Sequence, residues 1–281
     1  MGSAANGITI AACEAASPLD KLETRILMMH ALGLTRIQLI TRSEQVLAAE
    51  QLNALQNLIQ RRVAGEPIAY ITGEREFYGL SFTVTPDVLI PRPDTELLVE
   101  LALQYAPQNG NLLDMGTGSG AIAIAVAHQR ADLQVTALDV SEAALSVAHS
   151  NAQKILGQHS PRLRLLQSDW YGALAEQRFH TIASNPPYIV KNDRHLGEGD
   201  LRFEPVNALT DHGDGLSAYR TIIGGAAGHL HADGWLLMEH GYDQAEAVRG
   251  LLTLQGFTQV QSWRDLAGIE RVSGGVLSTA S

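Results

Sequence analysis

The sequence predicts a doubly wound α/β domain preceded by a small helical domain and a β-hairpin. Residues 8–65 have only helical periodicity, residues 66–90 change to a period nearer two, and from residue 111 onward strand-like and helix-like segments alternate. Such alternation is typical of parallel strands joined by crossover helices. We therefore expect a helical domain over residues 1–72, a hairpin linker over 73–90 and the α/β domain over 91–281.

The helical part contains two long amphipathic segments. LDKLETRILMMHALGL and SEQVLAAEQLNALQNLIQRRVAG repeat apolar residues at spacings of three and four, and Gly33 and Gly65 follow as stop signals. Ser43, followed by polar residues, predicts the N-terminal cap region of the second long helix. We expect these segments to pack as a small bundle.

The hairpin is predicted within EPIAYITGEREFYGLSFTVTPDVLI, with Gly73 and Gly79 as turn residues. The next segment, IPRPDTELLVELALQYA, begins with two prolines and continues with apolar periodicity. It predicts a rigid entry loop followed by a helix.

The α/β part supplies its expected elements in a regular order. They are NLLDMG, AIAIAVAHQR, QVTALDV, SEAALSVAHSNAQKIL, RLRLLQSD, RFHTIASNPPY, a helix around 217–231, GWLLMEHG, DQAEAVRGLLTLQG, QVQSWRDL and RVSGGVLST. Ligands of such folds bind beyond the carboxyl ends of the strands. Residues 189–216 form a charged, glycine-rich insertion, which we expect to be a solvated loop that borders the substrate in part.

Composition narrows the class of protein. A net charge of −10 over 281 residues gives no overall attraction to a polyanion, so a nucleic acid is disfavoured as the main partner. The single cysteine, Cys13, excludes an internal disulfide and a cysteine-cluster metal site, and fits a reducing cytoplasm. No apolar run reaches the roughly 18 residues of a membrane span, and the first residues do not resemble a secretion signal.

A glycine-rich loop lies within LLDMGTGSGAIAIAVA, residues 112–127. A dinucleotide site prefers G-x-G-x-x-G, whereas this loop has G-x-G-x-G with a carboxylate just before it. A carboxylate there repels a pyrophosphate and suits a cationic ligand such as S-adenosylmethionine. The candidate cofactor residues of this loop are Asp114, Gly116, Thr117, Gly118, Ser119 and Gly120.

Two further strand ends carry candidate cofactor residues. Asp139 ends QVTALDV, where an acid accepts hydrogen bonds from ribose hydroxyls of either NAD or S-adenosylmethionine. A surface aspartate that caps the next helix would look the same. In QSDWYG, Asp169 is placed to accept the adenine amino group and Trp170 to stack on the ring, although Trp170 as a core residue would also fit the pattern.

The motif SNPPYIV, residues 184–190, follows a buried strand. An amide nitrogen is a poor nucleophile, so an enzyme that methylates it must align it with the methyl donor. The Asn185 side-chain oxygen and the Pro186 carbonyl supply two acceptors for the amine hydrogens, Pro186 and Pro187 stiffen the turn, and Tyr188 offers a flat wall. We therefore expect Asn185, Pro186 and Tyr188 to be catalytic and all four residues to bind substrate. No strong base is required.

Other polar residues receive weaker interpretations. His195 in the insertion and His240 in MEHG are expected to be structural or solvated, and Glu239 is expected near the active cleft but receives no role. No Ser/His/Asp or Cys/His arrangement is apparent in the sequence.

With these motifs, the chain resembles the PrmC/HemK family of protein glutamine N5-methyltransferases, which modify class I peptide release factors. The resemblance covers nearly the whole chain and is most specific in IPRPDTE, RFEP and NPPY; the other matching stretches are GEPIAYITGEREFYGLSFTV, LLDMGTGSGAIAIA, LQSDWY, LLMEHG and WRDLAGIERV. It implies a helical N-terminal domain for substrate docking, joined by a hairpin to a class I S-adenosylmethionine-dependent methyltransferase domain. The implied substrate is the glutamine of the Gly-Gly-Gln motif.

The resemblance also implies site residues and a cofactor. It places S-adenosyl-L-methionine at Gly116 through Gly120, Asp139 and Trp170, has Asn185 touch both cofactor and substrate amide, and completes the glutamine pocket with Pro186, Pro187 and Tyr188. S-adenosyl-L-homocysteine would be the product. We expect no metal, a cytoplasmic monomer, and no direct nucleic-acid substrate or membrane partner.

Three alternatives remain. A DNA or RNA amino-group methyltransferase of the adenine N6 type uses the same NPPY site, but it needs a basic groove. A nicotinamide-dependent oxidoreductase shares the glycine loop and Asp139 but leaves NPPY unexplained. A non-enzymatic adaptor of release factors has no need for Asn185.

Overall fold

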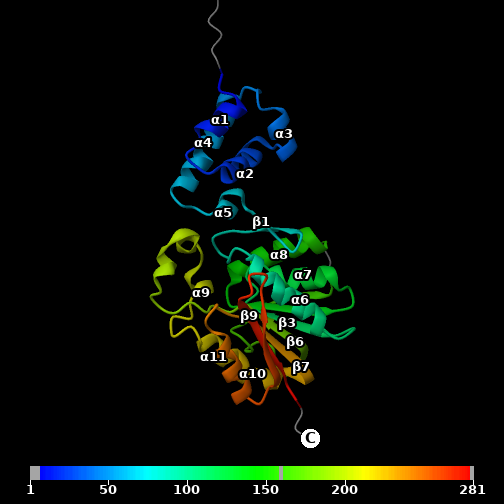
Figure 1. Ribbon diagram of the computed structural model, residues 1–281. Helices are drawn as coiled ribbons and strands as arrows, with labels where there is room; N and C mark the ends of the chain where they lie inside the picture. Colours follow the sequence, from blue (N-terminus) through cyan, green and yellow to red (C-terminus); the bar gives the residue numbers. More distant parts are fainter. Residues whose placement is uncertain (1–6, 158–160, 279–281) are drawn as a thin grey trace, which may run out of the picture. The chain divides into compact units, whose positions relative to one another are not determined.

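The computed structural model describes residues 7–157 and 161–278 (Figure 1). The chain divides into two compact units, Met1–Gly73 and Glu74–Ser281. Each unit has a hydrophobic core of its own.

The first unit is helical. Its helices are α1 (Ile10–Ala16), α2 (Lys21–Leu32), α3 (Arg36–Thr41), α4 (Ala49–Val63) and α5 (Ile68–Thr72). The α2 helix begins where the Asp20 carboxylate accepts from two backbone N–H groups and ends at Gly33, which has a φ of +63°. The core contains Leu27, Met28 and Leu55, all at most 1% exposed.

The predicted start of the second long helix was wrong. Ser43 lies in a turn, and α4 begins only at Ala49. The intervening residues are extended because Val46 forms a β-bridge with Thr9, and the Leu47 N–H donates to the Ile8 carbonyl. Pairing with a distant segment therefore overrides local helical propensity here.

The two-residue period expected from residue 66 also began too early. Residues 68–72 form helix α5, and Gly73, with a φ of +74°, ends it. The hairpin itself consists of β1 (Glu74–Phe77) and β2 (Leu80–Thr83), joined by Tyr78 and Gly79, both with positive φ. Two positive φ values are typical of the tight turn that matches strand twist.

The second unit is built on a seven-stranded sheet in the order β5-β4-β3-β6-β7-β9-β8. The strands are β3 (Asn111–Met115), β4 (Gln134–Asp139), β5 (Leu163–Gln167), β6 (Phe179–Ser184), β7 (Leu230–Glu239), β8 (Thr258–Arg264) and β9 (Glu270–Val276). Strands β3 to β7 pair in parallel, as expected. Strand β9 is antiparallel to both β7 and β8, so the parallel part of the sheet ends at β7. No helix joins β8 to β9, so the chain returns directly in the opposite direction.

Helices cover both faces of this sheet (Figure 1). They are α6 (Glu96–Tyr105), α7 (Ala121–Gln129) and α8 (Glu142–Leu156) on one face and α10 (Ser217–His229) and α11 (Ala245–Leu254) on the other. Side chains alternate between the faces: Leu112 packs in the first core and Leu113 in the second. The remaining helical turns are the 3₁₀ turns η1 (Pro93–Thr95), η2 (Arg194–Gly197) and η3 (Gly199–Phe203) and the short helix α9 (Val206–Leu209). In the described ranges, no helix is long and apolar enough to cross a membrane.

Asn151 joins three parts of the second unit. This residue of α8 is fully buried, and its Oδ1 accepts from the Thr83 N–H of the hairpin at 2.7 Å. Its Nδ2 donates to the Thr83 carbonyl and to the Ser119 carbonyl of the glycine loop, each at 2.9 Å. One side chain thus connects hairpin, helix and loop.

Replacing Asn151 by Ala should lower the free energy of unfolding by roughly 2–4 kcal/mol, because the half-buried N–H and carbonyl of Thr83 and the buried carbonyl of Ser119 lose their partner. Denaturant titration measures this loss. The control is Ser150→Ala, since the exposed Ser150 hydroxyl bonds only the Ser146 carbonyl of its own helix. Equal stability of the two variants would contradict the assigned role of Asn151.

Candidate functional site

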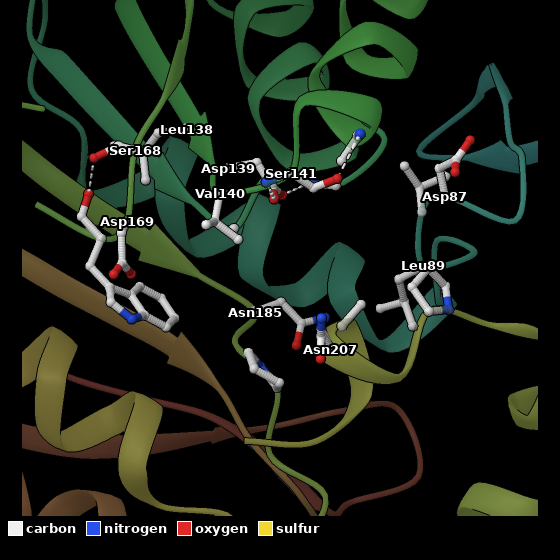
Figure 2. A pocket seen from close by; sticks show the side chains of 18 residues that line it. Asp87, Leu89, Leu138, Asp139, Val140, Ser141, Ser168, Asp169, Asn185 and Asn207 are labelled. Atoms are coloured by element: carbon white, nitrogen blue, oxygen red, sulfur yellow. Dashed lines mark hydrogen bonds between the residues drawn. The ribbon is translucent and has the colours of Figure 1, made fainter. Parts of the chain in front are cut away.

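A pocket lies at the carboxyl ends of the parallel strands (Figure 2). Its walls come from six segments of the second unit: 87–89 after the hairpin, Gly116 and Gly118, 138–141 and Ala144 around the end of β4, 168–170 after β5, Asn185 and Pro187 after β6, and Pro205, Asn207 and Ala208 of the insertion. The parallel sheet explains this convergence, because successive strands end at the same edge.

Asp139 fastens the glycine loop to the end of β4. One carboxylate oxygen accepts from the Gly118 N–H at 2.9 Å, and the other accepts from the Ser141 N–H at 2.9 Å (Figure 2). Gly118 has a φ of +54°, which suits a residue without a Cβ. Burial raises the pKa of Asp139, while these N–H donors lower it. Asp139 therefore lines the pocket and also fixes the loops that form its wall.

The N–H groups of the glycine loop are largely occupied. Gly116 and Thr117 donate to the Leu138 carbonyl, Gly118 donates to Asp139, and Gly120 donates to the Thr117 carbonyl. A pyrophosphate site instead requires loop N–H groups that are free to point at the phosphates. The loop therefore brings β3 and β4 together and offers these four donors to no anion.

Asp114 lies beneath the loop and does not line the pocket. Its Oδ2 accepts from the Thr117 hydroxyl at 2.6 Å and from the Ala123 N–H at 3.2 Å. Its Oδ1 is buried and has no hydrogen-bond partner among the described residues. Burial raises the pKa of this carboxyl to about 7. Thr117, Ser119 and Gly120 likewise contribute no wall of the pocket.

Asp169 and Trp170 line the pocket beyond β5. Trp170 is half-buried against the second core and has a φ of +46°, an uncommon conformation for a bulky residue. The Ser168 hydroxyl donates to the Trp170 carbonyl at 2.7 Å and accepts from the Ala173 N–H. These two bonds hold the turn that presents Asp169 and the indole.

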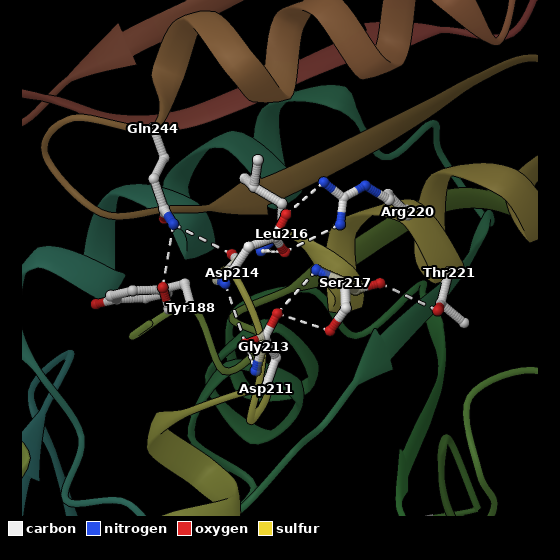
Figure 3. Close-up of polar contacts among 10 residues, drawn as sticks. Tyr188, Asp211, Gly213, Asp214, Leu216, Ser217, Arg220, Thr221 and Gln244 are labelled. Carbon is white, nitrogen blue, oxygen red and sulfur yellow. Dashed lines mark hydrogen bonds and ion pairs between the residues drawn. The ribbon is translucent and has the colours of Figure 1, made fainter. Parts of the chain in front are cut away.

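The residues of the NPPY motif divide between the pocket and the core. Asn185 and Pro187 line the pocket, while Pro186 is buried. The Tyr188 carbonyl accepts from Nε2 of Gln244 at 3.0 Å (Figure 3), and burial together with the nearby Glu239 raises the pKa of the Tyr188 phenol. The same Nε2 donates to the carbonyl of Gly215, where a Cβ would approach the Tyr188 carbonyl to 2.6 Å.

The insertion is folded rather than simply solvated. The Asp211 carboxylate accepts from the N–H groups of Gly213, Gly215 and Ser217 (Figure 3). Nearer the pocket, the buried Glu204 accepts from the Ile90 N–H at 3.1 Å and pairs with Arg92. This pairing of RFEP with IPRP brings Pro205, Asn207 and Ala208 to the pocket wall.

The sequence predicted no role for two residues that lie beside Asn185. Nδ2 of Asn185 donates to the Thr95 hydroxyl at 3.2 Å, and the carboxyl of Glu239 is buried next to both. The available signal was that Thr95 belongs to the motif IPRPDTE and Glu239 to the motif LLMEHG. The sequence does not show that these two motifs meet beside Asn185. His240 is buried, with hydrogen bonds to Gly241 and Ser273, whereas His195 is exposed beside Asp193. In the part of the chain that the structure describes, no three His, Cys, Asp or Glu residues are grouped to hold a metal.

Comparisons with known proteins agree with this architecture. Residues 9–73 match the family model described as PrmC N-terminal domain, and residues 93–200 match the Methyltransferase small domain. The chain is 57% identical over 267 residues to the release factor glutamine methyltransferase of Burkholderia pseudomallei (strain K96243), covering 93% of this chain and 94% of the relative. The corresponding Escherichia coli (strain K12) protein is 44% identical, with 92% and 93% covered.

A solved methyltransferase structure from Pyrococcus furiosus matches with a TM-score of 0.55 at 19% identity, covering 80% of this chain and all 100% of that chain. At this identity the likeness shows the fold alone. The comparisons confirm the expected class I methyltransferase fold with a helical N-terminal domain.

Replacing Asp114 by Asn should stabilise the protein increasingly as pH rises. A carboxyl whose pKa is higher in the folded state stabilises that state at low pH, and this contribution is lost as pH rises through about 7. The variant should therefore gain roughly 2–4 kcal/mol relative to the wild type between about pH 5 and about pH 8. Denaturant titration across this range gives the difference.

Asp132→Asn is the control for this series. Arg130 lowers the pKa of Asp132, so that carboxyl stays ionised in both the folded and unfolded states over the same range. Its effect on the free energy of unfolding should not change with pH. A pH-independent effect of Asp114→Asn as well would show that Asp114 ionises normally in the fold.

Proposed function

The chain belongs to the release factor glutamine methyltransferase family, and on that premise we propose that it methylates the glutamine of the Gly-Gly-Gln motif in class I peptide release factors. The methyl group would pass from S-adenosylmethionine to the N5 side-chain amide nitrogen. The observation that carries this proposal is the placement of Asn185 and Pro187 in the same pocket as Asp139 and the glycine loop. These relatives confirm the resemblance to the PrmC/HemK family that the motifs indicated.

The pocket fits an adenosine ligand with a cationic end. Asp139 would accept from the ribose hydroxyls, since each of its oxygens retains a lone pair, and Asp169 would accept from the adenine amino group. Trp170 and the apolar side chains of Leu138, Val140 and Ala144 would enclose the base and ribose. The occupied N–H groups of the loop argue against a dinucleotide, whose pyrophosphate would need them.

When bound, S-adenosylmethionine supplies an electrophilic methyl group on a sulfonium. The protein's own contribution is alignment of the amide nitrogen. Oδ1 of Asn185 accepts one amine hydrogen and the Pro186 carbonyl accepts the other, so the nitrogen lone pair is directed at the methyl carbon. Tyr188 provides the flat wall beside the amide. The proton released after transfer leaves to water, so no strong base is needed.

The described chain offers less support to the other functions. Three carboxylates, Asp87, Asp139 and Asp169, surround the pocket of a protein with a net charge of −10, which disfavours a nucleic-acid strand at its mouth. An adaptor without chemistry has no need for the hydrogen bond that orients Asn185. We further propose a monomer, since one chain supplies the lining residues of the pocket, and a cytoplasmic location, since a single cysteine fits a reducing compartment.

Incubating the protein with labelled S-adenosylmethionine and a purified bacterial release factor should label the factor. A factor with its Gly-Gly-Gln glutamine changed to alanine should take up no label, because the acceptor amide is absent. Duplex DNA serves as a second acceptor control, and the Asn185→Ala variant serves as the enzyme control. Label in DNA, or equal label in both factors, would refute the proposed substrate.

Replacing Asp139 by Ala should weaken cofactor affinity by roughly 1.5–3 kcal/mol, the scale of hydrogen bonds to a charged group. Calorimetric titration with S-adenosylhomocysteine measures the change. Asp132→Ala, which alters a half-buried carboxylate that does not line the pocket, is the control. An unchanged dissociation constant for Asp139→Ala would remove this carboxylate from the cofactor site.

A further inference from the structure

Asn185 is held by two buried side chains that do not themselves line the pocket. Nδ2 of Asn185 donates to Oγ1 of Thr95 at 3.2 Å, and Thr95 is only 4% exposed. Glu239 ends β7 and is 2% exposed. Because β6 and β7 are parallel with Ser184 opposite Met238, the next residues, Asn185 and Glu239, are neighbours.

Glu239 carries an unexplained polar atom. Its Oε2 is buried and has no hydrogen-bond partner within the described ranges. Its main-chain carbonyl accepts from the Tyr219 hydroxyl at 2.9 Å, which anchors the backbone but does not involve the carboxyl. A buried carboxyl with an unpaired oxygen costs stability, so its presence in a core requires a reason.

The hydrogen bond from Asn185 to Thr95 lies beside the Glu239 carboxyl and has a direction. Both Thr95 and Asn185 lower the pKa of this carboxyl, as side chains within hydrogen-bonding reach of it do. An ionised carboxylate only accepts, so the single Thr95 hydroxyl proton must point at Glu239. Oγ1 of Thr95 then has only lone pairs left for Asn185 and accepts from Nδ2. The Asn185 amide consequently presents its oxygen, and not its nitrogen, to the pocket.

We propose that Glu239, acting through Thr95, is a positioning residue that sets the orientation of the Asn185 amide so that Oδ1 faces the acceptor nitrogen. The inference rests on the proposed function, because only an amine acceptor needs an oxygen at this place. A reversed amide would present N–H donors to a substrate NH₂ group and would repel it.

Protonation of Glu239 would remove the constraint that keeps Oδ1 of Asn185 directed at the pocket. A protonated carboxyl has its own donor, so Thr95 is free to donate to Asn185, and the reversed amide becomes possible. Burial, with a smaller contribution from the negative charge of Asp94, raises the pKa of Glu239 to about 7. Thr95, Arg271 and Asn185 act in the opposite direction and lower this pKa. The other ionisable groups that face it are Tyr188 and Tyr219. Turnover should therefore rise with pH through this range.

The test compares two threonines that differ only in their contacts. Thr95→Val removes the hydroxyl between Asn185 and Glu239, whereas Thr181→Val removes a fully buried β6 hydroxyl that has no partner among the described residues. Thr95→Val should lower kcat for methylation of the release factor about 10- to 100-fold, the scale of a misplaced reacting group. Thr181→Val should leave kcat unchanged, and neither variant should alter the dissociation constant of S-adenosylhomocysteine.

Glu239→Gln tests the direction itself. A glutamine amide both donates and accepts, so it imposes no orientation and does not titrate. The variant should lose about 10-fold in kcat at pH 8 and should lack the rise of kcat with pH that the wild type shows. The Thr95→Val/Glu239→Gln double variant should be no slower than the slower single variant, because both remove the same constraint on Asn185.

The outcomes distinguish a failure of the proposed function from a failure of the role inferred for Glu239. A wild type that binds S-adenosylhomocysteine but methylates no release factor would overturn the proposed function and this inference with it. An active wild type with equal kcat for Thr95→Val and Thr181→Val would overturn the inference alone. Thermal unfolding of each variant identifies a folding failure; if Glu239→Gln does not fold, the threonine pair decides.

Discussion

The parallel pairing of β3, β4, β6 and β7 is the constraint on which the rest of the molecule depends. It places the ends of strands that are far apart in the sequence at one edge of the sheet, within reach of one ligand. Asp139 and Asn185 are 46 positions apart, yet both face the same pocket. The register between β6 and β7 likewise makes Asn185 and Glu239 neighbours.

Polar side chains at this edge of the sheet mainly hold the neighbouring loops in place around the pocket. Asp139 ties Gly118 and Ser141 together, Asn151 ties the hairpin to the glycine loop, and Glu204 ties the insertion to the entry loop. A buried carboxylate or amide is costly unless it is paired, so each of these residues gains its partners only when the surrounding elements are correctly placed. The pocket is thus shaped by hydrogen bonds between loops as much as by the sheet itself.

Two carboxyls depart from this pattern. Asp114 and Glu239 are both buried, each keeps one oxygen without a partner among the described residues, and burial raises the pKa of each to about 7. One lies beneath the glycine loop and the other behind Asn185, so a buried carboxyl with a raised pKa lies behind two different walls of the pocket. An unpaired oxygen on a buried carboxyl lowers the stability of the fold at both positions.

The sequence by itself determined the elements of the α/β domain, the glycine loop, Asp139 and the NPPY turn, because periodicity, glycine spacing and proline are local signals. Tertiary structure alone decided the late start of α4 at Ala49, the antiparallel β9, the buried place of Asp114 and the pairing of Glu204 with the entry loop. Thr95 and Glu239 belong to this second group, since 144 positions separate them in the chain. Such contacts depend on which strand ends become neighbours, and no local pattern encodes the strand order of a sheet.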